Sequence, residues 1–116
     1  MPYRVERSLD TDRDLAAIFD FLLNSYMDFG DDRSEALERA VARIEGIEAE
    51  MLALGDVPHQ GTLRPDLLSG LRSITKQRVI FYFDVDDDRR LVRVLAIFFG
   101  GQDHQRAMLQ RLSNSE

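Results

Sequence analysis

The strongest constraint on the fold comes from two neighbouring segments that are apolar on both faces, RVIFYFDV at Arg78–Val85 and LVRVLAIFF at Leu91–Phe99. Successive side chains of a strand point to opposite faces, so apolar residues on both faces are typical of a strand that is covered on both sides. The polar run Asp86–Arg90 between the two segments predicts a turn, and the strands then form a hairpin. We expect the first strand to be central in a sheet that needs a covering layer on each face.

We assign the apolar residues of this hairpin to the two faces by alternation along each strand. One face of the first strand carries Val79, Phe81, Phe83 and Val85. The opposite face receives Ile80 and Tyr82, together with Leu95, Ile97 and Phe99 or their neighbours. Large exposed apolar surface marks interaction sites, so this second face predicts either a further covering element or a protein partner.

Two amphipathic helices precede the hairpin. The first follows a cap at Asp10 or Thr11, and its apolar residues recur at spacings of three and four: Leu15, Ile18, Phe19, Leu22, Leu23 and Tyr26. The second carries the same pattern from Leu37 to Leu54 and ends at Gly55. The short break at Phe29–Asp32 predicts an antiparallel pair that packs on one face of the sheet. We interpret the charged side of the first helix as solvated surface: Asp12, Arg13, Asp14 and Asp20.

The remaining segments are short. Tyr3–Arg7 alternates like an edge strand with Tyr3 and Val5 facing inward, and Val57–Leu68 is typical of an ordered loop. Leu71–Ile74 predicts a strand followed by a turn at Thr75–Gln77, and Gln102–Leu112 predicts a terminal helix. The sequence therefore predicts an α+β domain: an N-terminal strand, an antiparallel two-helix hairpin on a mostly antiparallel sheet of about four strands, and a short C-terminal helix.

Composition restricts the chemistry that is available. The chain has 116 residues, 44% apolar and 31% charged, which predicts one domain over residues 1–116. It has no cysteine and two histidines, so we expect no metal and no cofactor. The opening segment MPYRVERSLD has no apolar run after its basic residues, and no stretch is long enough to span a bilayer. We therefore expect a cytoplasmic protein without membrane association.

Charge is unevenly distributed along the chain. The net charge is −6, and residues 1–58 hold 6 basic and 14 acidic side chains, whereas residues 59–116 hold 9 and 7. Binding to nucleic acid requires a surplus of basic groups to neutralise phosphates. We therefore expect no direct sequence-specific binding to nucleic acid. A modest positive patch is possible between Thr62 and Tyr82, where basic residues outnumber acidic ones: Arg64, Arg72, Lys76 and Arg78.

Six segments, in this order and at this spacing, are similar to one known family: YRVERS, DLAAIFDFL, VPHQGTLRPDLL, GLRSI, RVIFYFDVDDD and VLAIFFGGQDH. Together they cover nearly the whole chain. The chain resembles the RelE/ParE superfamily of toxins from bacterial toxin-antitoxin pairs. The resemblance implies the fold of that superfamily and a type II toxin.

The ending IFFGGQDH is similar to the ParE-like branch, which inhibits DNA gyrase and blocks replication without a hydrolytic active site. An acidic chain also suits a protein target better than the phosphate-rich surface of a ribosome. We expect the residues that contact the target to be Arg72, Lys76, Arg78, Gln102, Asp103 and His104.

Two alternatives stay open. In a RelE-like ribonuclease that cuts messenger RNA on the ribosome, Arg72 and Arg78 would stabilise charge, and Tyr82 or His104 would carry a proton. Against this alternative, Phe99 and Gly100 stand where that branch often has a basic residue or a histidine. The other alternative is a protein-binding module of the same fold that is not toxic.

The resemblance also implies a cognate antitoxin that forms a hetero-oligomer with the toxin. Its amphipathic segment would bury apolar side chains between the helix pair and the sheet, while its acidic residues pair with Arg72, Arg78 or Arg93. The candidate antitoxin-binding residues are Leu15, Phe19, Leu22, Arg93, Phe98 and Phe99.

Overall fold

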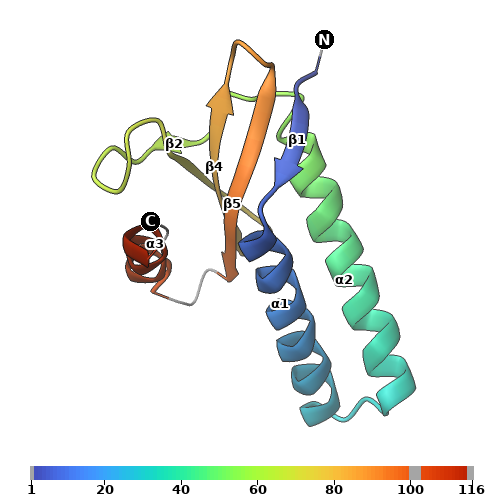
Figure 1. The fold of residues 1–116 in the computed structure, drawn as a ribbon. Coiled ribbons are helices and arrows are strands. Elements are labelled where there is room, and N and C mark those ends of the chain that lie inside the picture. The colour runs from blue at the N-terminus through green and yellow to red at the C-terminus, as the bar shows by residue number, and fades with distance from the viewer. Residues whose placement is uncertain (1, 100–102, 115–116) are drawn as a thin grey trace.

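A computed structural model describes residues 2–99 and 103–114, and in it one five-stranded sheet lies between a helix pair and a short third helix (Figure 1). The elements are β1 (Arg4–Arg7), α1 (Leu9–Asp28), α2 (Arg33–Ala53), β2 (Thr62–Leu63), β3 (Arg72–Lys76), β4 (Val79–Asp86), β5 (Leu91–Phe99) and α3 (His104–Asn114). The strand order is β1-β5-β4-β3-β2, and all pairs are antiparallel except β1 with β5. The predicted α+β fold is confirmed, with β2 as an additional strand inside the predicted loop. No described helix is long and apolar enough to cross a membrane.

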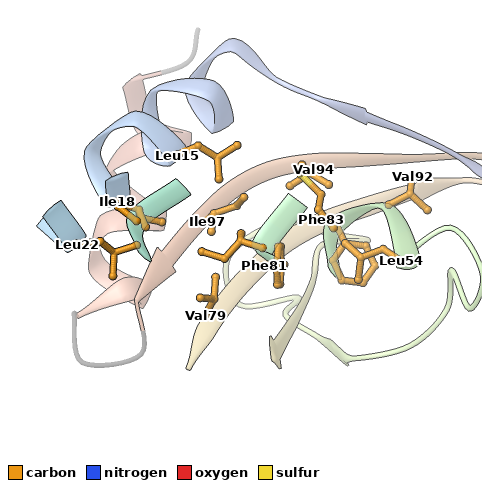
Figure 2. Close-up of a cluster of buried hydrophobic side chains, with 13 residues drawn as sticks. Leu15, Ile18, Leu22, Leu54, Val79, Phe81, Phe83, Val92, Val94 and Ile97 are labelled. Atoms are coloured by element: carbon orange, nitrogen blue, oxygen red, sulfur yellow. The ribbon is translucent and has the colours of Figure 1, made fainter. Parts of the chain in front are cut away.

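The central strand β4 separates two layers of buried side chains, as its alternation predicts. On the side of α1 and α2, the cluster includes Val79, Phe81 and Phe83 of β4 with Leu15, Ile18 and Leu22 of α1 (Figure 2). On the other side, Ile80 and Tyr82 pack with Met108 of α3. The helix α3 is therefore the element that covers the second face of the sheet.

A bulge in β5 changes which of its residues face the helix pair. Tyr82 of β4 pairs with Ala96, but the next residue, Phe83, pairs with Val94, so Leu95 is an extra residue on β5. Val94 and Ile97 consequently lie on the same face, in the cluster below α1. Of the two alternatives left open for the opposite face, Ile97 and Phe99 do not take it, because they lie on the side of the helix pair. Their neighbours Ala96 and Phe98 take that face instead.

Side chains at the start of α1 bind the backbone of β5 around this bulge. Ser8 caps α1 by accepting a hydrogen bond from the Thr11 amide, and the Thr11 hydroxyl donates to the Val94 carbonyl at 3.0 Å. Asp10 and Thr11 are therefore not the cap, because α1 begins at Leu9 and both residues lie inside its first turn. The Asp14 carboxylate accepts from the Ile97 amide at 3.0 Å.

Asp14 also binds α3, so it is not the solvated surface residue that the sequence predicts. Both carboxylate oxygens of Asp14 accept from the Arg111 guanidinium at 2.8 Å, and Arg111 donates further to the Leu95 carbonyl at 3.2 Å. The carboxylate raises the pKa of Arg111. This ion pair connects α3 to α1 across the edge of the sheet, and 11% of the Asp14 side chain is exposed.

The turn between β3 and β4 lies one residue later than predicted. Gln77 and Arg78 have φ angles of 51° and 69°, the left-handed backbone of a two-residue hairpin turn. Lys76 is therefore the last residue of β3, and Arg78 is in the turn rather than in β4. The Arg43 guanidinium of α2 donates to the Gln77 side chain at 3.0 Å, which fixes the turn against the helix pair.

Replacing Gly55 by alanine is expected to destabilise the fold. The Tyr3 amide donates to the Gly55 carbonyl at 2.8 Å, and an added Cβ at Gly55 would lie 2.2 Å from the Tyr3 carbonyl oxygen. We expect this clash to lower the free energy of unfolding by about 1–3 kcal/mol, which urea unfolding measures. The matched variant Gly46→Ala places its Cβ in open space within α2, so it should gain about 0.5–1 kcal/mol. Equal effects of the two variants would contradict the close approach of β1 to α2.

The Asp14→Ala variant tests the connection between α1, β5 and α3. It leaves the Ile97 amide and the Arg111 guanidinium without their shared acceptor, which costs about 1–3 kcal/mol. Urea unfolding measures this loss, and limited proteolysis should cut α3 faster than in the unmodified chain. As a control, Asp20→Ala removes an exposed carboxylate of α1 and should change stability by no more than about 0.5 kcal/mol. A similar loss in both variants would show that Asp14 has no special role.

Candidate functional site

An apolar groove lies between α1 and the end of β5. It has a volume of about 470 Å³ and is lined by Asp14, Ala17, Ile18, Phe21, Ile97, Phe98 and Phe99. It exists because β1 is short: the last pair between β1 and β5 is Arg7 with Val94, and β5 continues to Phe99. The outer edge of β5 beyond Val94 is therefore beside α1 and not beside another strand.

The groove has an exposed aromatic side chain at its rim. Phe21 is 58% exposed, and its ring centroid lies 5.4 Å from that of Phe99, with the two rings tilted at 57°. On the α3 side, Arg111 stands over the Phe98 ring at 5.2 Å. An exposed aromatic ring beside a concave apolar surface is typical of a site where another apolar side chain binds.

Of the candidate antitoxin-binding residues, Phe98 and Phe99 line the groove. Leu15 and Leu22 are buried in the core, and Phe19 packs against it, so these three side chains face the sheet. Arg93 is held by Asp84 through two contacts, of 2.8 and 3.2 Å, and this carboxylate raises the pKa of Arg93.

Sequence reasoning missed the residues of α1 that line the groove, Ala17 and Phe21. Ala17 and Phe21 are four residues apart, and residues at this spacing lie on the same face of a helix. This spacing is the signal in the sequence that could have identified them. Ile18 was already assigned to the apolar face, and it borders the groove while packing in the core.

Two residues predicted to carry a proton are brought together. The Tyr82 hydroxyl and Nδ1 of His104 are 2.7 Å apart. Tyr82 is fully buried below α3, and this burial raises the pKa of its hydroxyl, an effect that nearby Arg64 opposes. The Arg64 guanidinium also lies 3.4 Å from the Ser73 hydroxyl, so this member of the predicted positive patch is a cation near Tyr82, although it was not among the expected site residues.

The two predicted charge-stabilising arginines do not join this pair. Ser73 pairs with Tyr82 and shares its face, whereas Arg72 pairs with Phe83 and faces the helix pair. The Arg72 guanidinium donates to the His59 carbonyl at 2.8 Å. Arg78 lies at the other end of β3, in the turn. The residues proposed for a ribonuclease are therefore divided between the two faces and the two ends of β3.

Further candidate target-binding residues lie apart from the groove. Lys76 pairs with Glu50 of α2 at 3.6 Å. Asp103 precedes α3 and accepts from the Arg106 amide at 3.3 Å, and His104 is the first residue of α3. Gln102 lies outside the described residues.

A polar cluster fixes the loop after α2 at the opposite end of the sheet from the groove. Tyr3 donates to Oδ1 of Asp87 at 2.8 Å, and Nε2 of His59 lies 2.8 Å from the same oxygen. The hydrogen bond from Tyr3 is the main cause that lowers the pKa of Asp87 and raises that of Tyr3. Over residues 2–99 and 103–114, no group of three acidic, histidine or cysteine side chains could hold a metal ion.

Comparison with known proteins identifies the fold. No family model matches the sequence, and no curated protein matches it. Among solved structures, a chain of the chromosomal ParDE TA system from P. aeruginosa is 21% identical with a TM-score of 0.65, and the match covers 84% of this chain and 95% of that one. A chain of the toxin-antitoxin complex RelBE2 from Mycobacterium tuberculosis is 18% identical with a TM-score of 0.50, covering 85% and 99%. The chain therefore shares its fold with chains of these two toxin-antitoxin structures, and of the two it is more similar to the chain of the ParDE system.

Proposed function

We propose that this chain is the toxin of a type II toxin-antitoxin pair, that it inhibits DNA gyrase, and that an antitoxin segment neutralises it by binding in the groove. The observation that carries the proposal is the apolar groove with its exposed Phe21, on a fold shared with chains of two toxin-antitoxin systems. The partner is an amphipathic segment that buries its apolar side chains against α1 and β5.

The backbone contacts along the edge of β5 favour a helix over an added strand as the occupant of the groove. A strand would need the free amides and carbonyls of the β5 edge. At Leu95 and Ile97 these groups are already bound by Arg111 and Asp14. A helix needs no backbone hydrogen bonds from its partner, and it can fill the groove with side chains alone.

Gyrase is a more suitable target than messenger RNA for two physical reasons. The net charge of −6 opposes approach to a surface of phosphates. The four residues expected of a ribonuclease are also not assembled, since Arg72 and Tyr82 lie on opposite faces of β3 and β4.

One observation favours the ribonuclease as a second candidate. Tyr82 and His104 form a hydrogen-bonded pair with Arg64 nearby, which is a combination of proton carriers and a cation. Tyr82 is fully buried, so this chemistry would require α3 to leave the sheet.

Induction of the chain alone in bacterial cells distinguishes the candidates. We expect growth arrest with filamentation, intact messenger RNA, and loss of supercoiling by purified gyrase when the chain is added. The Tyr82→Phe variant should keep this activity, because it removes one hydrogen bond at a cost of about 0.5–1.5 kcal/mol. Arrest with shortened messenger RNA that Tyr82→Phe abolishes would establish the ribonuclease instead. No arrest at all would leave a binding module without toxicity.

The Phe21→Ser variant tests neutralisation separately from toxicity. Co-expression with the cognate antitoxin should rescue growth with the unmodified chain and fail to do so with Phe21→Ser. The lost apolar contact should weaken the complex about tenfold or more, measured by calorimetry.

The control for this variant is Leu9→Ser. Leu9 is also on α1 and 66% exposed, but it lies about 120° around the helix from Phe21. Leu9→Ser should be neutralised like the unmodified chain. Normal neutralisation of Phe21→Ser would exclude the groove as the antitoxin site.

A further inference from the structure

We infer that the segment that occupies the groove is a basic amphipathic helix, one whose flanks carry lysine or arginine. This inference rests on the proposed function, because it takes the groove as the antitoxin site. It concerns the charge of the partner, which neither the fold nor the similar structures indicate.

The helix α1, which forms one wall of the groove, carries a surplus of acidic residues. This helix has one basic residue, Arg13, and five acidic residues: Asp10, Asp12, Asp14, Asp20 and Asp28. The first three form ion pairs, with Arg13 at 3.6 Å, with Arg7 at 2.8 Å and with Arg111 at 2.8 Å respectively. Asp20 and Asp28 are exposed and have no ion-pair partner within the described part of the chain.

These two carboxylates lie where a helix in the groove would pass. Asp28 follows Phe21 by seven residues, so it lies on the same stripe of α1, about 10 Å further along the axis. Asp20 follows Ala17 by three residues and stands at the outer side of the stripe. A helix in contact with Ala17 and Phe21 therefore passes two carboxylates of α1 that no ion pair among the described residues neutralises, Asp20 at its side and Asp28 beyond Phe21.

The elements around the groove do not supply a matching positive surplus. On α3, Arg111 is neutralised by Asp14, and Arg106 pairs with Asp103 at 3.4 Å. Arg78 is exposed and directly precedes Val79, which pairs with Phe99, so it adds a single cation at this end of the sheet against the two carboxylates of α1. An acidic partner would therefore meet repulsion from two carboxylates of α1, which one cation at the end of the sheet does not balance.

This charge pattern differs from the expectation that acidic residues of the antitoxin pair with Arg72, Arg78 or Arg93. Arg93 is already held by Asp84 through two contacts, and Arg72 donates to the His59 carbonyl on the opposite side of the sheet from α3. The unpaired charges of α1 beside the groove, Asp20 and Asp28, are negative, and they outnumber the single exposed Arg78 at the end of the sheet.

Two synthetic peptides of 16 residues test the inference. They share one apolar helix face and differ on the flanks, which carry lysine in one peptide and glutamate in the other. We expect the lysine peptide to bind the full chain about threefold to tenfold more tightly in low salt, measured by fluorescence anisotropy, and the difference to shrink in 0.5 M salt as screening shortens to about 4 Å. Tighter binding of the glutamate peptide would overturn the inference, and so would equal binding.

Variants of the chain separate a specific site from general attraction to an acidic protein. The double variant Asp20→Asn and Asp28→Asn should weaken the lysine peptide about threefold to tenfold, and the exposed control Asp56→Asn should leave it unchanged. Phe21→Ser should weaken both peptides. An equal effect of Asp56→Asn would overturn the inference, because the attraction would then not depend on the groove.

Failure of the inference and failure of the proposed function give different results. If Phe21→Ser prevents neutralisation by the antitoxin but the glutamate peptide is preferred, the groove is the antitoxin site and the charge assignment is wrong. If Phe21→Ser is neutralised normally and neither peptide competes with the antitoxin, both are wrong.

Discussion

Burial of β4 on both faces is the constraint on which the rest of the structure depends. Phe81 and Phe83 pack below the helix pair, and Ile80 and Tyr82 pack below α3. Full burial of a phenylalanine contributes about 1.5–3 kcal/mol, so neither face can stay in water without a large loss of stability. The helix pair covers one face, and α3 has to cover the other. The position of α3 is therefore a consequence of the central strand and not a property of its own short sequence.

The groove follows from the way in which the edge of β5 is closed. A neighbouring strand protects the edge as far as Val94, and side chains protect it beyond that point. Thr11 and Asp14 of α1 and Arg111 of α3 bind the exposed backbone groups around the bulge at Leu95. These contacts satisfy the edge without filling the space beside it. Phe21 and Phe99 border that space, and Phe21 is exposed there.

Periodicity predicted the elements well, because each helix and central strand buries one or two continuous stripes of side chains. Periodicity did not predict the features that depend on contacts between residues distant in the sequence. The bulge at Leu95 depends on the pairing of β5 with β4, the cap at Ser8 depends on the burial of Thr11, and the role of Asp14 depends on Arg111, which is distant in sequence. For the site, Phe98 and Phe99 were predicted, whereas Phe21 was missed since it lies outside the buried stripe of α1. Tyr82 and His104 were both proposed from chemistry, but their contact requires α3 to return to the sheet.

The central claim is that an antitoxin covers the groove, and thiol labelling tests it directly. The chain has no cysteine, so Ala17→Cys places a single thiol on the exposed α1 wall of the groove, and Leu9→Cys places one on another side of the same helix. Labelling of each variant is followed by mass spectrometry with and without the antitoxin. The account predicts that the antitoxin slows labelling at position 17 about tenfold or more and leaves position 9 unchanged. Equal labelling rates at position 17 with and without bound antitoxin would contradict it.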